Sequence, residues 1–251
     1  METKNAIQCN DVTIGYSSQC IQSGLSFSLK QGELICLLGP NGCGKSTLLR
    51  TLAGIQPPLS GNILMSAERP IVMTSRTECA KEIALVLTER VSLENTSVHD
   101  VVAMGRYPYT SFFGGLTQQD EQIIYQSLEA VGLQHIAQTY FNAHSDGEKQ
   151  RVLIAKAIAQ QTPIILLDEP TAHLDLPNRI RILNLLQTLA HTQNKTILIS
   201  THELELAKTV SDRALLMWRD GVVLDTIENL QKKDLFSKAF DMDLSEIGYF
   251  K

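Results

Sequence analysis

The chain has no apolar run approaching the roughly 20 residues that a membrane-spanning helix requires. Its first ten residues include Glu2 and Lys4 and lack the apolar core of a signal peptide. Five cysteines, an odd number without a C-x-x-C pair, indicate neither a disulfide framework nor a zinc site. The 22 lysines and arginines are spread out, and the net charge is −5, which argues against nucleic-acid binding. We therefore expect a cytoplasmic protein that reaches a membrane only through a partner.

What the chain does contain is ordinary for a folded protein, since 43% of its 251 residues are hydrophobic. Alternation of apolar and polar residues predicts short strands at 6–9, 12–14 and 25–29, and the segments 61–65 and 83–87 are interpreted as further strands. Residues 66–82 are interpreted as a polar loop. From Val98 the apolar residues recur every three to four positions, which predicts a helical insertion over residues 90–158.

The segment GPNGCGKST at residues 39–47 fits the phosphate-loop pattern G-x-x-x-x-G-K-[ST]. It stands between an apolar run and a helix-like segment, the strand–loop–helix context that the motif requires. Glycines let backbone N–H groups surround a polyphosphate, Lys45 supplies an ammonium group, and Ser46 offers a hydroxyl oxygen to Mg²⁺. A chance glycine-rich turn is the alternative, which the later motifs disfavour. The residues expected to contact nucleotide here are Gly39, Pro40, Asn41, Gly42, Cys43, Gly44, Lys45, Ser46 and Thr47.

Cys43 lies inside this loop and near the start of a helix, an environment that commonly lowers the pKa of a thiol. Either the thiol is reactive and its alkylation blocks hydrolysis, or cysteine is only a small residue that fits the loop. The sequence leaves the two readings equally open.

Residues 163–167 form a continuous apolar run, typical of a strand buried on both faces of a parallel sheet, and Asp168 and Glu169 follow it. Ligands bind at the carboxyl ends of such strands. Because consecutive side chains of a strand point to opposite faces, one carboxylate can hold a metal ion and the other can polarise a water molecule. A solvated turn is the alternative. His202 follows a second buried run, 196–200, at the same kind of strand end.

The start of another helix is marked by Ser145 and Glu148, which fit the S-x-x-E capping box. Capping alone does not account for Gly147, which would expose backbone N–H groups as an anion site does.

Two aromatic features also have open interpretations. Tyr16, between two predicted strands, is either a half-buried turn residue or a ligand contact. The segment 105–115 holds four aromatic residues and is either core packing or a surface anchor for a partner. These four are Tyr107, Tyr109, Phe112 and Phe113.

Together these motifs resemble the ATP-binding cassette of an ABC transporter over nearly the whole chain. GPNGCGKST resembles Walker A, IILLDE resembles Walker B, HSDGEKQR the signature, and AHLD at 172–175 the D-loop, all in the family's order. His202 resembles the switch histidine, and Tyr16 the aromatic residue that stacks on adenine. The segment GRYPYTSFFGGL further resembles the subgroup that serves importers of iron-siderophore, haem or cobalamin compounds.

The resemblance implies an ATPase at the cytoplasmic face of the inner (cell) membrane, working as a head-to-tail homodimer that encloses two ATP. It implies a permease partner contacted through residues 105–115, no nucleic-acid partner and no direct membrane insertion. The implied catalytic residues are Lys45, Glu169 and His202, and the implied Mg²⁺ ligands are Ser46, Asp168 and Glu89. Nucleotide contacts across the dimer are implied for Ser145, Gly147 and Glu148.

Two departures from the family pattern stand out. The Q-loop glutamine falls on Glu89, whose carboxylate can hold Mg²⁺ but cannot donate a hydrogen bond and repels a triphosphate. In the signature, His144 and Asp146 replace the usual leucine and first glycine. We expect activity to be retained.

The expected fold is α/β: a P-loop NTPase parallel-sheet core with an antiparallel β-portion and a helical subdomain. One domain would span 1–251, with a catalytic core of 1–89 and 159–225, a helical subdomain of 90–158 and a short C-terminal extension of 226–251. A soluble ABC ATPase acting on nucleic acid or ribosomes would need a second cassette, a coiled-coil insertion or a basic face, and the sequence has none. A P-loop kinase would not need the SDGE helix start, and Glu169 argues against an adaptor without turnover.

Overall fold

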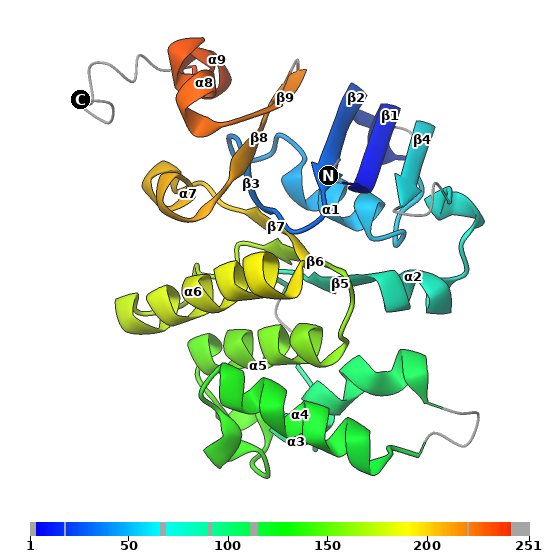
Figure 1. Cartoon of the computed structure of the whole chain (residues 1–251), viewed down its shortest axis with the longest axis vertical. Coiled ribbons are helices and arrows are strands. Elements are labelled where there is room, and N and C mark those ends of the chain that lie inside the picture. The colour runs from blue at the N-terminus through cyan, green and yellow to red at the C-terminus, as the bar shows by residue number, and fades with distance from the viewer. Residues whose placement is uncertain are drawn as a thin grey trace.

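The structure, a computed structural model, describes residues 4–17, 19–65, 69–89, 92–110, 115–219 and 221–241. It contains a small sheet, a larger sheet and a group of helices below the larger sheet in the view of Figure 1. That group consists of α3 (Val98–Ala103), α4 (Gln118–Ala130) and α5 (Asp146–Ala159). In the part of the chain that is described, no helix is both long and apolar enough to cross a membrane.

The small sheet is antiparallel, with strand order β2-β1-β4. Its strands are β1 (Asn5–Tyr16), β2 (Gln19–Lys30) and β4 (Ser60–Met65). The segments 6–9 and 12–14, expected as two strands, belong to β1, because a register shift at Asp11 (φ 51°) lets the ladder continue. A Cβ atom at Gly61 would lie 2.3 Å from the Asp11 carbonyl oxygen, so this irregularity requires glycine opposite it.

The larger sheet has the order β5-β6-β7-β3-β8-β9 and is parallel except for β9. Its strands are β3 (Leu34–Leu38), β5 (Ile83–Val86), β6 (Ile164–Asp168), β7 (Thr196–Ser200), β8 (Arg213–Trp218) and β9 (Gly221–Asp225). Every residue of β3, β6 and β7 is buried, which explains their unbroken apolar runs. The two sheets and the helices confirm the predicted α/β fold with an antiparallel portion.

Helices flank the larger sheet, and alternate residues of β3 contribute to two different cores. Leu34, Cys36 and Leu38 belong to one core, and Ile35 and Leu37 to the other. The remaining helices are α1 (Lys45–Leu52), α2 (Arg76–Glu82), α6 (Leu176–Gln193), α7 (Leu204–Val210), α8 (Ile227–Lys232) and α9 (Leu235–Phe240).

The prediction of a polar loop over residues 66–82 is wrong from residue 71 onward, where the chain forms a 3₁₀ turn at Ile71–Met73 and the helix α2. Ser75 and Glu78 form a capping box, with 3.3 Å from the Glu78 N–H to the Ser75 hydroxyl. Only Cys79 of α2 is buried, so the helix has almost no apolar periodicity by which a sequence pattern could reveal it.

A buried arginine joins the elements of the helical part. Arg106 lies in the 3₁₀ helix Met104–Tyr109, and its guanidinium donates to Asp120 of α4 and to the Ala159 carbonyl of α5, both at 2.8 Å. Hydrogen bonds from Thr117, and then the guanidinium of Arg106, lower the pKa of Asp120 to about 2. Arg106 thus ties the last residue of α5, the helix whose first turn carries the signature residues, to α4.

Candidate functional site

The phosphate loop connects β3 to α1, and glycine is required at both of its ends. Gly44, the N-cap of α1, has a left-handed φ of 106°, and a Cβ atom there would lie 2.7 Å from Ile21. A Cβ atom at Gly39 would lie 2.0 Å from the Met217 carbonyl oxygen. Side chains at either position would push the loop away from β2 and β8, so the glycines set its path.

Lys45, the first residue of α1, is 7% exposed and donates to the carbonyl oxygens of Gly39 and Pro40 at 2.8 and 3.0 Å. These bonds hold the ammonium group against the loop. A cavity of about 240 Å³ lies in front of it. The cavity lining comprises Ile21, Asn41, Gly42, Gly44, Lys45, Ser46, Thr47, Thr88, Asp168 and Glu169.

Asp168 and Glu169, the two acidic residues at the end of β6, both line this cavity but are held there by different hydrogen bonds. Asp168 is 5% exposed and accepts a hydrogen bond from the Ser200 hydroxyl. Glu169 has a left-handed φ of 44°, and its N–H donates to the Ser200 hydroxyl and carbonyl oxygens at 3.0 and 3.2 Å. Backbone strain of this kind, held by surrounding bonds, is frequent at functional sites. Ser200, at the end of β7, thus orients both residues, a role that the sequence analysis missed.

His202 follows β7, at the strand end where the sequence analysis placed it, and its Nδ1 lies 3.2 Å from a Glu169 carboxylate oxygen. Tyr16 ends β1 and is 48% exposed, so its ring is accessible to a planar ligand. Lys45, Asp168, Glu169 and His202 therefore converge, although they come from distant parts of the sequence.

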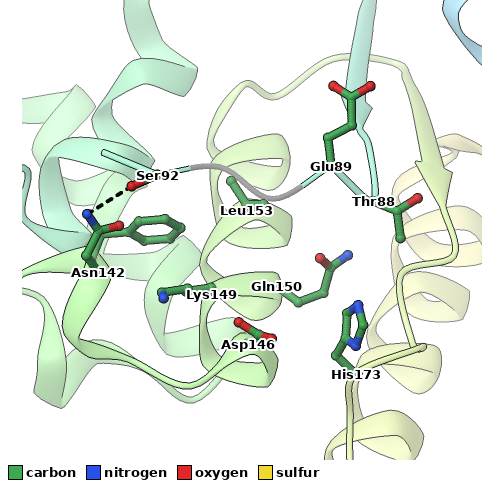
Figure 2. Close-up of a pocket in the computed structure, with 10 residues that line it drawn as sticks. Thr88, Glu89, Ser92, Asn142, Asp146, Lys149, Gln150, Leu153 and His173 are labelled. Carbon is green, nitrogen blue, oxygen red and sulfur yellow. Dashed lines mark hydrogen bonds between the residues drawn. The ribbon is translucent and has the colours of Figure 1, made fainter. Parts of the chain in front are cut away.

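Glu89, expected as a metal ligand, does not line this cavity. Its carboxylate instead pairs with the guanidinium of Arg50 on α1. The preceding residue, Thr88, lines the cavity around Lys45. Figure 2 shows a neighbouring pocket that is lined by both Thr88 and Glu89, whose side chains point in different directions. In this structure the charge of Glu89 is neutralised outside the cavity by Arg50, which the sequence analysis did not single out, so a role for Glu89 at a metal would require its carboxylate to leave this ion pair.

The signature residues at the start of α5 do not line the cavity around Lys45. The Ser145 hydroxyl accepts from the Glu148 N–H at 3.3 Å and donates to the Glu148 carboxylate at 2.7 Å, which confirms the capping box. The same hydrogen bonds lower the pKa of Glu148. A Cβ atom at Gly147 would lie 2.8 Å from the His173 carbonyl oxygen, so close packing against the D-loop segment suffices to explain this glycine.

The surroundings of Cys43 distinguish the two readings that the sequence left open. Burial raises the pKa of its thiol, and Lys45 offsets only part of this effect. The residue is 9% exposed, and its sulfur would lie 3.0 Å from a Cβ atom at Gly39. The thiol therefore packs inside the loop, which favours the reading of cysteine as a small residue that fits.

The aromatic residues of the segment 105–115 have different surroundings. Tyr107 is 59% exposed. The ring of Tyr109 lies 4.3 Å from the Arg106 guanidinium carbon, and its hydroxyl donates to the Gln160 carbonyl oxygen at 2.9 Å. Tyr109, although 40% exposed, is thus held by Arg106 and the Gln160 carbonyl, whereas Tyr107 is the more exposed of the two. Phe112 and Phe113 lie outside the described residues.

Comparison with known proteins gives one consistent result. A family model described as ABC transporter matches residues 22–172. The iron(3+)-hydroxamate import ATP-binding protein FhuC of Bacillus subtilis is 35% identical over 240 residues, which cover 95% of this chain and 89% of that protein. The ferric enterobactin transport ATP-binding protein FepC of Escherichia coli is 32% identical over 223 residues, covering 89% and 82%.

The fold agrees with a solved structure as well. The structure of cbiO1 from Clostridium perfringens, part of the ABC transporter complex cbiONQ, superposes with a TM-score of 0.77 at 25% identity and covers 98% of each chain. Sequence match, fold and convergent site residues thus agree, and the chain belongs to the ABC transporter family as an ATP-hydrolysing subunit.

Proposed function

We propose that this chain drives an ABC importer for an iron-siderophore, haem or cobalamin-type compound. The observation that carries the ATPase part of the proposal is the single cavity that Lys45, Asp168 and Glu169 share, with His202 beside Glu169. The cargo class is supported by the relatives, which are named for import of ferric hydroxamates and ferric enterobactin.

Nucleotide phosphates bind at the loop, where Lys45 and the backbone N–H groups at the start of α1 provide positive charge. The residues present fit Mg²⁺, because the Ser46 hydroxyl and the Asp168 carboxylate both line the cavity and supply the oxygen ligands that this ion prefers. Among the described residues no cluster of three or more His, Cys, Asp or Glu could hold a metal by itself. Mg²⁺ would therefore arrive with the nucleotide and neutralise charge on its phosphates.

Hydrolysis requires a water molecule in line with the terminal phosphate. Glu169 takes the role of orienting or deprotonating that water, because its backbone is fixed by Ser200 and its carboxylate lines the cavity. His202 stabilises the terminal phosphate, and Tyr16 stacks on the adenine ring.

The second half of each site comes from another copy of the chain. Ser145 and Asp146 are exposed, and neither lines the cavity around Lys45 of the same chain. In a head-to-tail homodimer, Ser145, Gly147 and Glu148 of one copy would face the ATP held by the other. Two ATP would then be enclosed between the subunits.

The permease partner contacts the helical subdomain through residues 105–115, with Tyr107 as an accessible anchor. A neighbouring groove supports the location, since a cavity of about 340 Å³ is lined by Ile55, Cys79 and Gln160, the residue whose carbonyl binds Tyr109. The complex would place this chain at the cytoplasmic face of the cell membrane.

The proposal is tested by expressing the chain together with candidate permeases encoded for siderophore, haem and cobalamin uptake. Capture of one permease and MgATP-dependent uptake of its cargo are expected. Hydrolysis without any permease capture would leave the ATPase assignment standing and refute the importer assignment. Uptake of none of the three cargo types by a captured permease would refute the cargo class.

A further inference from the structure

The start of α5 carries a negative charge where the proposed homodimer would bring a triphosphate. The Glu148 carboxylate accepts hydrogen bonds from the backbone N–H and the hydroxyl of Ser145, at 3.0 and 2.7 Å. These bonds lower the pKa of Glu148, so its carboxyl group is ionised at neutral pH. An acid held at this place repels a phosphate group unless a neighbouring cation balances its charge.

The basic side chain in contact with Glu148 is that of His144, which departs from the family's signature pattern. Its Nδ1 atom lies 3.6 Å from a Glu148 carboxylate oxygen, and its side chain is 12% exposed. Two other basic side chains of α5 are directed elsewhere. Arg151, whose charge also lowers the pKa of Glu148, donates to the Val131 carbonyl oxygen at 3.2 Å, and Lys149 lines the pocket shown in Figure 2. His144 is therefore the group placed to balance the charge of Glu148.

The second ring nitrogen of His144 determines where its protons lie. The Nε2 atom is 2.6 Å from the Thr139 hydroxyl oxygen. Thr139 gives its single hydroxyl proton to the Ile136 carbonyl oxygen, 2.7 Å away, so the hydroxyl oxygen accepts from Nε2. In neutral His144 the proton is thus on Nε2, and the lone pair of Nδ1 faces the Glu148 carboxylate. A second proton, on Nδ1, replaces this repulsion with an attraction.

The ring lies between two anchored groups, so its charge acts at a fixed place. On one side is Thr139, which does not titrate and whose carbonyl oxygen accepts from the N–H of Val98 on α3 at 2.9 Å. On the other side is the Glu148 carboxylate, with the exposed Asp146 adding negative charge to the same turn. Histidine is the side chain that ordinarily gains its charge between about pH 8 and 5. The charge at the start of α5 should therefore depend on pH in that range.

We propose that protonated His144 neutralises Glu148 and so allows the start of α5 to bind the terminal phosphate of the ATP held by a second copy. The inference rests on the proposed head-to-tail homodimer. His144 acts through Glu148 rather than by touching the phosphate. Dimerisation driven by MgATP should depend on the charge of His144, whereas folding of the single chain should not, because a partly exposed ion pair contributes little to stability.

Sedimentation velocity with MgATP measures dimerisation of the full chain carrying Glu169→Gln, the parent, which should retain ATP because its hydrolysis is impaired. His144→Gln removes the ring charge and keeps a polar side chain. At pH 6 it should weaken dimerisation about fivefold, the upper end for a partly exposed ion pair. At pH 9, where histidine is ordinarily neutral, parent and variant should dimerise alike. His202 is present in both proteins, so its titration cancels from the comparison. A defect of equal size at both pH values would overturn the role of the charge.

Removal of the acid tests the same pair from its other side. Glu148→Gln keeps the capping box, since glutamine also serves at this position. In the Glu148→Gln background, His144→Gln should leave dimerisation at pH 6 unchanged, because no negative charge remains to be balanced. A fivefold loss in that background, or a large fall in melting temperature there, would show that the ring acts by packing and would refute the proposal.

His191→Gln is the matched control, because it removes a histidine that pairs with an acid elsewhere, Asp212 at 3.0 Å. It should dimerise like the parent at both pH values, and a loss equal to that of His144→Gln would refute a specific role for the signature pair.

The parent itself separates this inference from the proposed function. Failure of the Glu169→Gln chain to dimerise with MgATP at either pH would overturn the homodimer and this inference with it. Dimerisation of the parent without any difference in His144→Gln at pH 6 would overturn only the inference.

Discussion

Replacing Glu169 with glutamine is the sharpest test of the catalytic site, because the geometry isolates one chemical property. The strained backbone of Glu169 is held by hydrogen bonds from its N–H to Ser200, which the substitution leaves in place. Glutamine has the same shape and retains an oxygen that can accept from His202, 3.2 Å away in the wild type. Asp168 and Lys45 are untouched. Only the negative charge and the basicity at the cavity wall disappear.

The expected loss follows from that single change. A positioned general base contributes roughly 10²- to 10⁴-fold, so Glu169→Gln should lower kcat by roughly 10²-fold or more, or about 2.7 kcal/mol or more of barrier. ATP binding should persist, since the phosphate loop is intact. Because hydrolysis no longer removes ATP, the homodimer should accumulate in size-exclusion chromatography with MgATP.

Phosphate release at saturating MgATP measures the loss, and Glu205→Gln provides the control. Glu205 is an exposed glutamate of α7 that does not line the cavity around Lys45, and its carboxylate lies 3.4 Å from the Lys208 ammonium group. The control should turn over ATP like the wild type. Wild-type turnover in Glu169→Gln would remove Glu169 from its role.

Three further predictions follow from side-chain environments. Tyr109→Ala should lower the free energy of unfolding by about 1–2 kcal/mol, because it loses a cation–π contact and a hydrogen bond. Tyr107→Ala should keep the wild-type melting temperature and weaken permease capture. Equal melting temperatures of the two variants would show that the contacts of Tyr109 do not stabilise the fold. At neutral pH, Cys43 should alkylate more slowly than the exposed Cys20, because burial raises the pKa of the Cys43 thiol; mass spectrometry showing faster modification of Cys43 would contradict this. The pKa of Asp120 is depressed in the folded state, so its ionised carboxylate stabilises the fold above pH about 4, and this contribution is lost as the pH falls to about 2. The free energy of unfolding of Asp120→Asn should therefore depend less on pH in this range. Identical pH profiles for wild type and variant would contradict the prediction.

Much of the site was predictable because its motifs are short and their geometry is local. The phosphate loop needs only a strand, glycines and a helix start, all adjacent in sequence. Buried parallel strands have unbroken apolar runs, so the position of Asp168 and Glu169 at a strand end could be inferred from residues 163–167 alone. The capping box at Ser145 is equally local.

What escaped prediction depends on contacts between distant segments. Thr88 and Glu89 are adjacent, but Thr88 lines the cavity while Glu89 pairs with Arg50, a contact 39 residues apart that no local pattern reveals. In the sequence Ser200 is only the last residue of an apolar strand. Because β7 pairs with β6, the Ser200 hydroxyl forms hydrogen bonds with both Asp168 and Glu169, and this pairing cannot be inferred from local sequence. For Cys43 the sequence supplied a nearby helix start and Lys45 but not the burial that outweighs both.

Gly147 shows how one residue type can have a structural cause and still lie at a binding surface. Its contact with the His173 carbonyl accounts for glycine without any ligand, so the glycine itself is no evidence for an anion site. The better argument for a shared nucleotide site is one of position. Ser145 and Asp146 are exposed at the start of α5, and the cavity around Lys45 is lined by other residues. Because the buried Arg106 ties α5 to α4, a second copy is the simplest source of a signature segment at each nucleotide.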